Sequence, residues 1–235
     1  MFEGMNKPEN LHQRPIVSVD LAIFALAPDG LEVLLAQRGT EPFAGSWALP
    51  GGWIHVEEDE DLEAAAQRVL SEKTGVAAPY FEQVGVFGNA ARDPRGWSLS
   101  VTYMALIAQD AVILQHGGNV TDAAWHPIDS ETAAKPLAFD HAAILKAAVT
   151  RLRNKVEYTT LPVHLLPEAF TLSELQAVYE RLLGRMLDKS AFRKRIAEVD
   201  FIEPIAGEMR RASNRPAQLY RLKQARSTVF FDRTI

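Results

Sequence analysis

Residues 49–76 read LPGGWIHVEEDEDLEAAAQRVLSEKTGV, a glycine-rich loop followed by a helical pattern. Between residues 62 and 74 apolar side chains recur at helical spacing, and Gly75 readily adopts the left-handed conformation that ends helices. Gly51 and Gly52 allow backbone amides to approach a ligand closely, because they carry no Cβ. The stretch therefore predicts a ligand-binding loop that leads into a helix with one buried face. That face consists of Leu62, Ala65, Ala66, Val69 and Leu70.

The segments around this loop and helix have the alternation typical of strands. Residues 16–39 predict a β-hairpin with its turn at Pro28-Asp29-Gly30. Further strands are expected at 81–89, 98–108 and 123–126, with a short one near 53–55, and a helix at 140–153 with Asp140 as its N-cap. This order predicts an α/β domain, an α/β/α sandwich with a mixed sheet, over residues 1–154.

After the linker at 154–168 the pattern changes to short helices and a hairpin. Thr171 and Glu174 form a capping box before an apolar stripe that Gly184 ends, and a second helix runs from Asp188 to about residue 199. Two strands, 201–207 and 217–223, flank the polar tip EMRRASNRP. Residues 155–235 are therefore expected to form a winged helix-turn-helix domain.

Composition and charge bound the class of protein. The chain has 235 residues, 47% of them hydrophobic, and no cysteine, which excludes disulfides and thiolate metal sites. The N-terminus has no apolar core of a signal peptide, and the most apolar run is interrupted by Asp20, so we expect a soluble cytoplasmic protein without a membrane partner. Residues 1–150 carry 9 Lys+Arg and 20 Asp+Glu, whereas residues 151–235 carry 16 and 10. The basic half is suited to a polyanion, although a solvated basic surface is the alternative.

The loop and helix at 49–76 resemble the signature of the Nudix family. The matching positions are Gly52 and then Arg68-Val69-Leu70-Ser71-Glu72-Lys73-Thr74-Gly75-Val76, supported by WALPGG before them and RDPRG after them. In that family, carboxylates at the positions of residues 69, 72 and 73 share one helical face and hold Mg²⁺ over a diphosphate. The resemblance implies a nucleoside-diphosphate cleft.

The chain departs from the Nudix signature at the metal ligands. Val69 offers no ligand atom, Lys73 adds a positive charge, and the spacing from Gly52 to Arg68 is two residues longer than the family norm. We therefore expect no catalytic residues and no required cofactor, and Mg²⁺ binding is doubtful. The alternative is that loop carboxylates from Glu57, Glu58 or Asp59 complete a metal site, with Glu58 and Glu72 as the residual candidates.

The cleft nevertheless retains groups for binding a nucleotide. Arg38, Arg92 and Arg95 can fork onto phosphate oxygens, and Trp47 or Trp53 can stack on an adenine or ribose face. The loop RDPRG resembles that of Nudix proteins that handle ADP-ribose. The alternatives are that Asp93 pairs with Arg95 within the turn and that Trp47 belongs to the core. The predicted effector-binding residues are Arg38, Trp47, Leu49, Gly51, Gly52, Glu72, Arg92 and Arg95.

The helix that starts at Asp188 has the pattern of a DNA-reading helix. Phe192, Ile196 and Val199 define a buried face, so polar and small residues point to the opposite side, where they can enter a major groove. Arginines of the wing suit backbone phosphates. A winged helix can also contact protein, with Arg195 and Glu198 as a mere surface pair. The predicted DNA-binding residues are Lys189, Ser190, Arg193, Lys194, Arg210, Arg211 and Arg215.

The two-domain plan resembles the Nudix-related transcriptional regulators of the NrtR family, including FDHAAILKAAVTRLR between the domains and RPAQLYRL in the wing. The resemblance implies a homodimeric repressor of genes for NAD biosynthesis or salvage. It implies binding to a palindromic double-stranded DNA operator and release by ADP-ribose. The alternatives are an active Nudix hydrolase of ADP-ribose or a related nucleoside diphosphate with an accessory winged helix, and a Nudix-type regulator that responds to a sugar.

Overall fold

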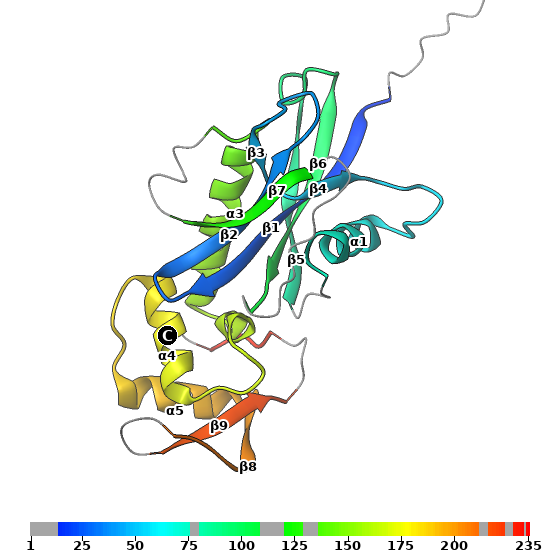
Figure 1. Cartoon of the computed structure of the whole chain (residues 1–235). Helices are drawn as coiled ribbons and strands as arrows, with labels where there is room; N and C mark the ends of the chain where they lie inside the picture. The colour runs from blue at the N-terminus through cyan, green and yellow to red at the C-terminus, as the bar shows by residue number, and fades with distance from the viewer. Residues whose placement is uncertain are drawn as a thin grey trace, which may run out of the picture.

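The computed structural model describes residues 14–75, 80–108, 120–128, 136–211, 216–223, 228–232 and 234–235. A large sheet with its helices forms the upper part of the molecule in Figure 1, and the helices and hairpin of the C-terminal part lie below it. Among the described helices, none has the length and apolar character needed to span a bilayer.

The long strand β1 (Ile16–Ala27) lies at the centre of the sheet. It forms the predicted hairpin with β2 (Gly30–Arg38), pairing Ala27 with Gly30 across a two-residue turn, and it runs parallel to β6 (Ser98–Leu106). The antiparallel strands β5 (Tyr80–Asn89) and β7 (Val120–Pro127) extend the sheet beside β6 and β2. The sheet is therefore mixed, as predicted.

Two short strands hold the glycine-rich loop against the sheet. β3 (Trp47–Ala48) pairs with β2, and β4 (Gly51–Trp53) pairs with β1, so that Gly51 lies opposite Asp20. The prediction near residues 53–55 was therefore displaced by about two residues, and β3 was not predicted. Segments of two or three residues are too short to show a period, and their conformation depends on the strands that they meet.

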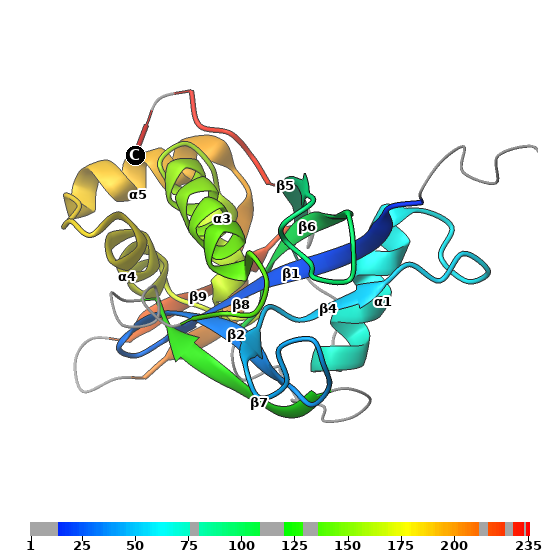
Figure 2. The same ribbon diagram turned by 90° about the horizontal axis from the view of Figure 1, so that it is seen from above.

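The two helices of this part cover opposite faces of the sheet, as Figure 2 shows. Helix α1 (Leu62–Thr74) has the predicted bounds, with the Asp61 side chain as N-cap and Gly75 in the left-handed conformation. Its Ala65, Ala66, Val69 and Leu70 are buried, whereas Leu62 is 39% exposed, contrary to prediction.

Helix α3 (His141–Val156) covers the other face and runs three residues further than predicted. Asp140 stands at the N-cap position, as predicted, but its side chain makes no capping hydrogen bond. Its carboxylate instead accepts hydrogen bonds from the guanidinium of Arg92. A charged partner from a distant loop has replaced the local backbone amide as donor.

The C-terminal part has the predicted winged helix-turn-helix elements. Helix α4 (Leu172–Leu183) begins with the complete capping box of Thr171 and Glu174, and α5 (Lys189–Val199) begins with Asp188 as its N-cap. The hairpin of β8 (Ile202–Arg210) and β9 (Ala217–Leu222) follows. Gly184 ends α4 in the left-handed conformation, as expected.

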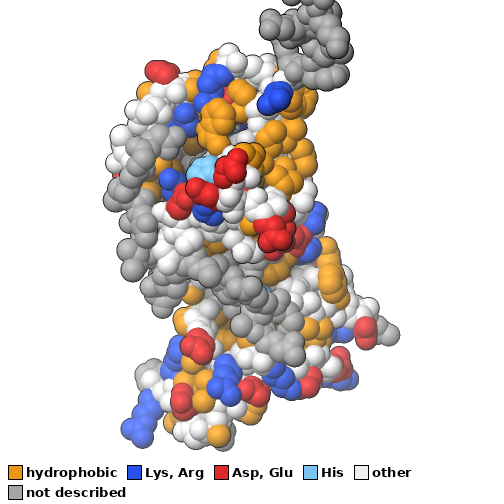
Figure 3. Space-filling view, turned by 90° about the vertical axis from the view of Figure 1, so that its right-hand side faces the viewer, with side chains coloured by type: hydrophobic (Ala, Val, Ile, Leu, Met, Phe, Trp, Pro, Cys, Tyr) orange, Lys and Arg blue, Asp and Glu red, His pale blue; other side chains and the backbone are white. Residues whose placement is uncertain are grey.

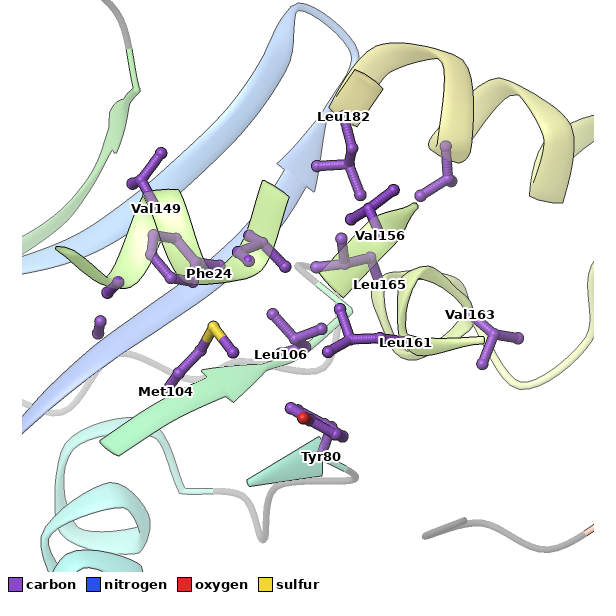
Figure 4. Close-up of a cluster of buried hydrophobic side chains, with 14 of the residues drawn as sticks. Phe24, Tyr80, Met104, Leu106, Val149, Val156, Leu161, Val163, Leu165 and Leu182 are labelled. Atoms are coloured by element: carbon purple, nitrogen blue, oxygen red, sulfur yellow. The ribbon is translucent and has the colours of Figure 1, made fainter. Parts of the chain in front are cut away.

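The segment predicted as a linker is instead part of the core. Residues Leu161–Leu165 form a 3-10 helix, η2, whose five side chains are all buried. Figure 4 shows Leu161 and Leu165 between side chains of the sheet, such as Phe24 and Leu106, and Leu182 of α4. One continuous apolar cluster therefore joins the sheet, α3 and the winged helix-turn-helix.

Candidate functional site

A cleft of about 260 Å³ opens at the edge of the sheet where the glycine-rich loop crosses β1. Its wall at Gly51 requires glycine, because a Cβ there would lie 2.1 Å from Asp20 Oδ1 and 2.8 Å from the carbonyl oxygen of Val19. A Cβ on Gly52 would lie 2.8 Å from a methyl group of Val69. The loop backbone is therefore held directly against β1 and α1.

The cleft lining carries more positive than negative charge, although residues 1–150 are strongly acidic. Among the described residues, five cationic and three anionic side chains line it. Asp59 and Asp140 lie outside this lining but contact Arg68 and Arg92, and counting them brings the positive and negative charges to five each. The cations are Arg38, Arg68, Lys73, Arg92 and Arg95, and the anions are Asp20, Glu72 and Asp93.

A buried network built around Arg92 forms the floor of the cleft. The Arg92 side chain is 4% exposed and lies 3.0 Å from Asp140 and 3.5 Å from Asp20. It also donates to Ser98 Oγ at 3.3 Å. Because Asp140 immediately precedes α3, this ion pair connects the cleft to that helix.

His141, which the sequence analysis did not single out, completes the floor. Its Nδ1 accepts a hydrogen bond from the backbone N–H of Leu49 at 2.9 Å, so the neutral ring carries its proton on Nε2, which faces Asp20 at 3.5 Å. Burial lowers the pKa of His141 and keeps the ring neutral. The first residue of α3 is thus fastened to the loop that precedes Gly51.

Arg38 and Arg95 lie at the mouth of the cleft around Phe139. Their guanidinium carbons lie 4.8 Å and 5.9 Å from the centre of that ring, and Arg95 also lies 5.2 Å from the ring centre of Trp53. The predicted alternative pair is present, because Arg95 contacts Asp93 at 2.7 Å. The hydrogen bond from Arg95 lowers the pKa of the Asp93 carboxyl.

Seven of the eight predicted effector-binding residues line the cleft: Arg38, Leu49, Gly51, Gly52, Glu72, Arg92 and Arg95. Trp47 instead packs against His126 with ring centres 4.6 Å apart and adjoins the core, in line with the alternative prediction that it is a core residue. Trp53, which is 55% exposed, lines the cleft in its place. The strand alternation explains the difference, since β3 turns the Trp47 side chain to the α3 face.

The residues present do not fit the magnesium ion that the Nudix signature implies. Val69 is 1% exposed and belongs to the core beneath α1, and Lys73 lines the cleft. The Glu72 carboxylate pairs with Arg68 at 3.1 Å. Within the described residues there is no group of three or more His, Asp or Glu side chains that could hold a metal ion.

The acidic loop does not supply the missing ligands in this structure. Asp59 is held by two hydrogen bonds of 2.8 Å from Arg68, which lower the pKa of its carboxyl to about 2. Glu58 pairs with His55 at 3.0 Å. Acidic side chains gather beside a histidine on the face shown in Figure 3. Of the residual metal candidates, Glu72 lines the cleft, whereas Glu58 pairs within its own loop.

The predicted reading face of α5 is exposed. Phe192 and Ile196 are 2% exposed and pack inward, and Val199 is partly buried. The exposed face opposite carries Lys189, Ser190, Arg193, Lys194 and Ala197. Figure 3 shows that basic and acidic side chains are mixed over this part of the molecule, so pairing decides which cations are available.

Several cations of the C-terminal part are paired with carboxylates. Arg210 contacts Glu174 and donates to the carbonyl of Ala169, so this predicted phosphate contact also ties the wing to the start of α4. Arg195 lies 3.9 Å from Glu198, in line with the alternative prediction that these two residues form a surface pair. Lys189, Arg193, Lys194 and Arg211 form no ion pair within the described residues. Arg215 lies outside the described residues.

Comparison with known proteins agrees with this organisation. The NUDIX domain model matches residues 18–148, and the model of the NrtR DNA-binding winged helix domain matches residues 162–222. The chain is 47% identical over 210 residues to the ADPR responsive transcriptional repressor NtrR of Acinetobacter baylyi. The aligned residues make up 88% of this chain and 82% of that protein.

Two solved structures of Shewanella oneidensis NrtR are similar as well. The one complexed with a 27mer DNA has 41% identity and a TM-score of 0.85, covering 93% of this chain and 99% of that one. The NUDIX domain complexed with ADP ribose has 41% identity and a TM-score of 0.56, covering 63% of this chain and 94% of that one. The chain therefore belongs to the NrtR family, in which a Nudix domain is joined to a DNA-binding winged helix domain.

Proposed function

We propose that the protein is a transcriptional repressor that binds operator DNA through its winged helix and is released when ADP-ribose occupies the Nudix cleft. One observation carries this proposal: a cleft lined by arginines and a lysine, in which the described residues offer no metal ligand set, shares a continuous core with a winged helix that has an exposed basic face. The A. baylyi relative, described as ADPR responsive, and the S. oneidensis structures with DNA and with ADP ribose support it.

The cleft suits ADP-ribose in three ways. Arg38 and Arg95 present guanidinium groups at its mouth, where a diphosphate can accept forked hydrogen bonds. Trp53 offers an exposed ring for stacking. Arg92 is paired with two carboxylates, so we expect it to stabilise the floor of the cleft and not to donate hydrogen bonds to phosphate. This division refines the expected roles of the three arginines.

The proposed DNA surface consists of the exposed face of α5 and the wing. Arg193 and Lys194 stand where a helix enters a major groove, and Arg211 stands where a wing meets backbone phosphates. The domain boundary is proposed at 154/155, within the last turn of α3. Because the apolar cluster crosses this boundary, the two domains are not independent bodies.

The signal would pass through α3. A ligand can release DNA only if it binds the DNA-incompetent arrangement more tightly than the competent one. Asp140 and His141 join the first residues of α3 to the cleft, while Val149, Leu152 and Val156 join its other end to the shared core. A change at the cleft floor would therefore move α3 against α4.

A homodimer on a palindromic operator is the assembly proposed here, with genes of NAD biosynthesis or salvage as its targets. Two recognition helices related by a two-fold axis fit successive major grooves about 34 Å apart. An operator for such a dimer has two half-sites with the same spacing.

A gel shift with the DNA upstream of the protein's own gene tests the function. We expect a specific protein–DNA complex that dissociates when ADP-ribose is added. Ribose at the same concentration should have no effect. A complex that is indifferent to ADP-ribose, or no complex at all, contradicts the proposal.

The effector is checked by a thermal-shift panel of ADP-ribose, NAD and arabinose, because a ligand that binds only the native state raises its stability. A shift with arabinose instead identifies a sugar-responsive regulator.

Incubation of the full chain with ADP-ribose and Mg²⁺ or Mn²⁺ tests the hydrolase alternative. We expect no turnover at enzyme-like rates, since Val69 and Lys73 remove two of the three carboxylates that the Nudix signature uses. Release of AMP and ribose 5-phosphate at such rates assigns the protein to the hydrolases instead.

A further inference from the structure

We infer that Lys73 takes the place of the Nudix metal, so that its ammonium group neutralises the diphosphate of the ligand and binding needs no divalent cation. This inference rests on the proposed binding of ADP-ribose and adds a residue role and a cation independence to it. It starts from the disagreement between the signature and the residues of this cleft.

Lys73 occupies the helix position at which the Nudix signature has one of its metal-binding carboxylates. It occupies the last turn of α1, next to Glu72, and both residues line the cleft together with the Gly51-Gly52 loop. Val69, one turn earlier, faces the core and packs beneath Gly52. The helix therefore turns one cation and one carboxylate toward the ligand.

The carboxylate beside Lys73 already has a cationic partner. Arg68 contacts Glu72 at 3.1 Å and also contacts Asp59 at 2.8 Å, so the two acids next to the helix share one arginine. The other two acids of the lining, Asp20 and Asp93, lie beside Arg92 and Arg95. Each acid that lines the cleft thus has an arginine within 3.5 Å.

Lys73, in contrast, forms no ion pair with any residue in the described ranges, and its side chain is partly buried. A partly buried ammonium that lacks a carboxylate partner gains from an anion brought to it, since the surrounding dielectric is lower than in water. Arg68, the other cation that α1 places in the lining, is held by two carboxylates, so Lys73 is the α1 cation available to a diphosphate. A divalent cation at this position would be repelled by the ammonium group.

Titration calorimetry of the full chain with ADP-ribose, in EDTA and in Mg²⁺, tests the inference. We expect wild type to bind equally well in both buffers. Lys73→Met, which keeps the length of the stem and removes the charge, should weaken binding about 10- to 100-fold, the range for one charge-assisted contact. Lys73→Arg should retain most of the affinity. The matched control is Lys146→Met, which removes a charge exposed on α3 outside the cleft.

The variant Lys73→Glu gives an independent readout because it places two adjacent carboxylates at the cleft. It should bind poorly in EDTA and better in Mg²⁺, a cation dependence that wild type lacks. Far-UV circular dichroism confirms that each variant is folded.

Three outcomes overturn the inference while leaving ADP-ribose binding intact. They are a wild-type affinity that requires Mg²⁺, a Lys73→Met variant that binds like wild type, and a Lys73→Glu variant that is indifferent to Mg²⁺. Absence of any binding by wild type in either buffer overturns the proposed effector itself and the role of Lys73 with it.

Discussion

The guanidinium of Arg92 is held by Asp140 and Asp20, which lie 48 positions after it and 72 before it in the chain. Arg95, three residues away, pairs with Asp93 and keeps an exposed side chain at the mouth of the cleft. Two arginines of the same loop thus have different roles, because one side chain enters the protein and the other does not. At the scale of a residue, burial and partner decide which of its possible contacts it makes.

Arg193 and Arg211, which are exposed and form no ion pair within the described residues, carry a prediction about DNA. Arg193→Ala should weaken binding to the operator by about 1–3 kcal/mol and relax base preference, because α5 presents this side chain to the groove. Arg211→Ala should weaken all sequences alike and reduce the salt dependence, because a wing arginine contacts phosphate. Fluorescence anisotropy with operator and scrambled DNA at several salt concentrations measures both. Wild-type binding by the two variants would place the reading surface elsewhere.

His164 in η2 carries a prediction about pH. Both ring nitrogens are buried with no hydrogen-bond partner among the described residues, and burial lowers the pKa of His164 to about 4. Below pH 6.5 the His164 ring is protonated in the unfolded chain but stays neutral in the folded protein. The free energy of unfolding therefore falls as pH falls from about 6.5 to about 4. The loss from this group approaches about 3 kcal/mol.

The substitution His164→Phe tests this account, since it keeps a ring beside Tyr80, whose ring centre lies 5.3 Å away. We expect the variant to be at least as stable as wild type at pH 7, because it buries no unpaired nitrogen. Urea unfolding between pH 7 and pH 4 should show a smaller loss than in wild type. An unchanged slope would mean that other groups, such as the buried His141, carry the acid sensitivity.

At the scale of elements, α3 contacts both the ligand cleft and the shared core. Its first residue, His141, binds the loop at Leu49, and Asp140 before it binds Arg92. Its last turn packs with η2 and α4. A helix of 16 residues transmits a displacement along its axis because its hydrogen bonds make it stiff over that length.

Hydrogen exchange with and without ADP-ribose tests the role of α3. We expect ligand to change protection across residues 140–170, which include α3 and η2, since the ligand would act on the floor to which α3 is fastened. The variant Asp140→Asn should bind ADP-ribose yet show a smaller change, because the ion pair with Arg92 is lost. Protection that changes at the cleft alone would exclude this helix as the connection.

At the scale of the whole molecule, one apolar cluster spans the family's two domains. Leu161 of η2 is fully buried between the sheet and α4, as Figure 4 illustrates. The tail returns to the same region, where Phe231 is 7% exposed near Tyr179, while Phe230 stays on the surface. The junction is therefore a packed interior and not a flexible tether.

This shared core predicts a single unfolding transition. Leu161→Ala should lower the free energy of unfolding by about 2–5 kcal/mol, the range for a buried leucine, and shift both domains together. Leu62→Ala is the matched control, because its side chain is 39% exposed and little apolar surface is lost. Calorimetry should show one peak for each variant. Two separated peaks would mean that the domains fold independently.

Local patterns in the sequence determined most of the elements. The two-residue turn between β1 and β2, the bounds of α1 and the capping box of α4 depend on residues within a few positions of one another, so their spacing was enough. The replacement of Nudix carboxylates by Val69 and Lys73 could be recognised in the same way. Short strands such as β3 were not predicted, since two residues are too few to show the alternation of a strand.

Only the tertiary structure decided how the chemical groups are partnered. The pairing of Arg92 with Asp140, the floor position of His141 and the inward turn of Trp47 join residues that are far apart in the chain. The supposed linker was found to be core because its apolar side chains meet the sheet on one side and α4 on the other. Helical period and turn chemistry act over a few residues, whereas burial and ion pairing depend on which distant surfaces come together.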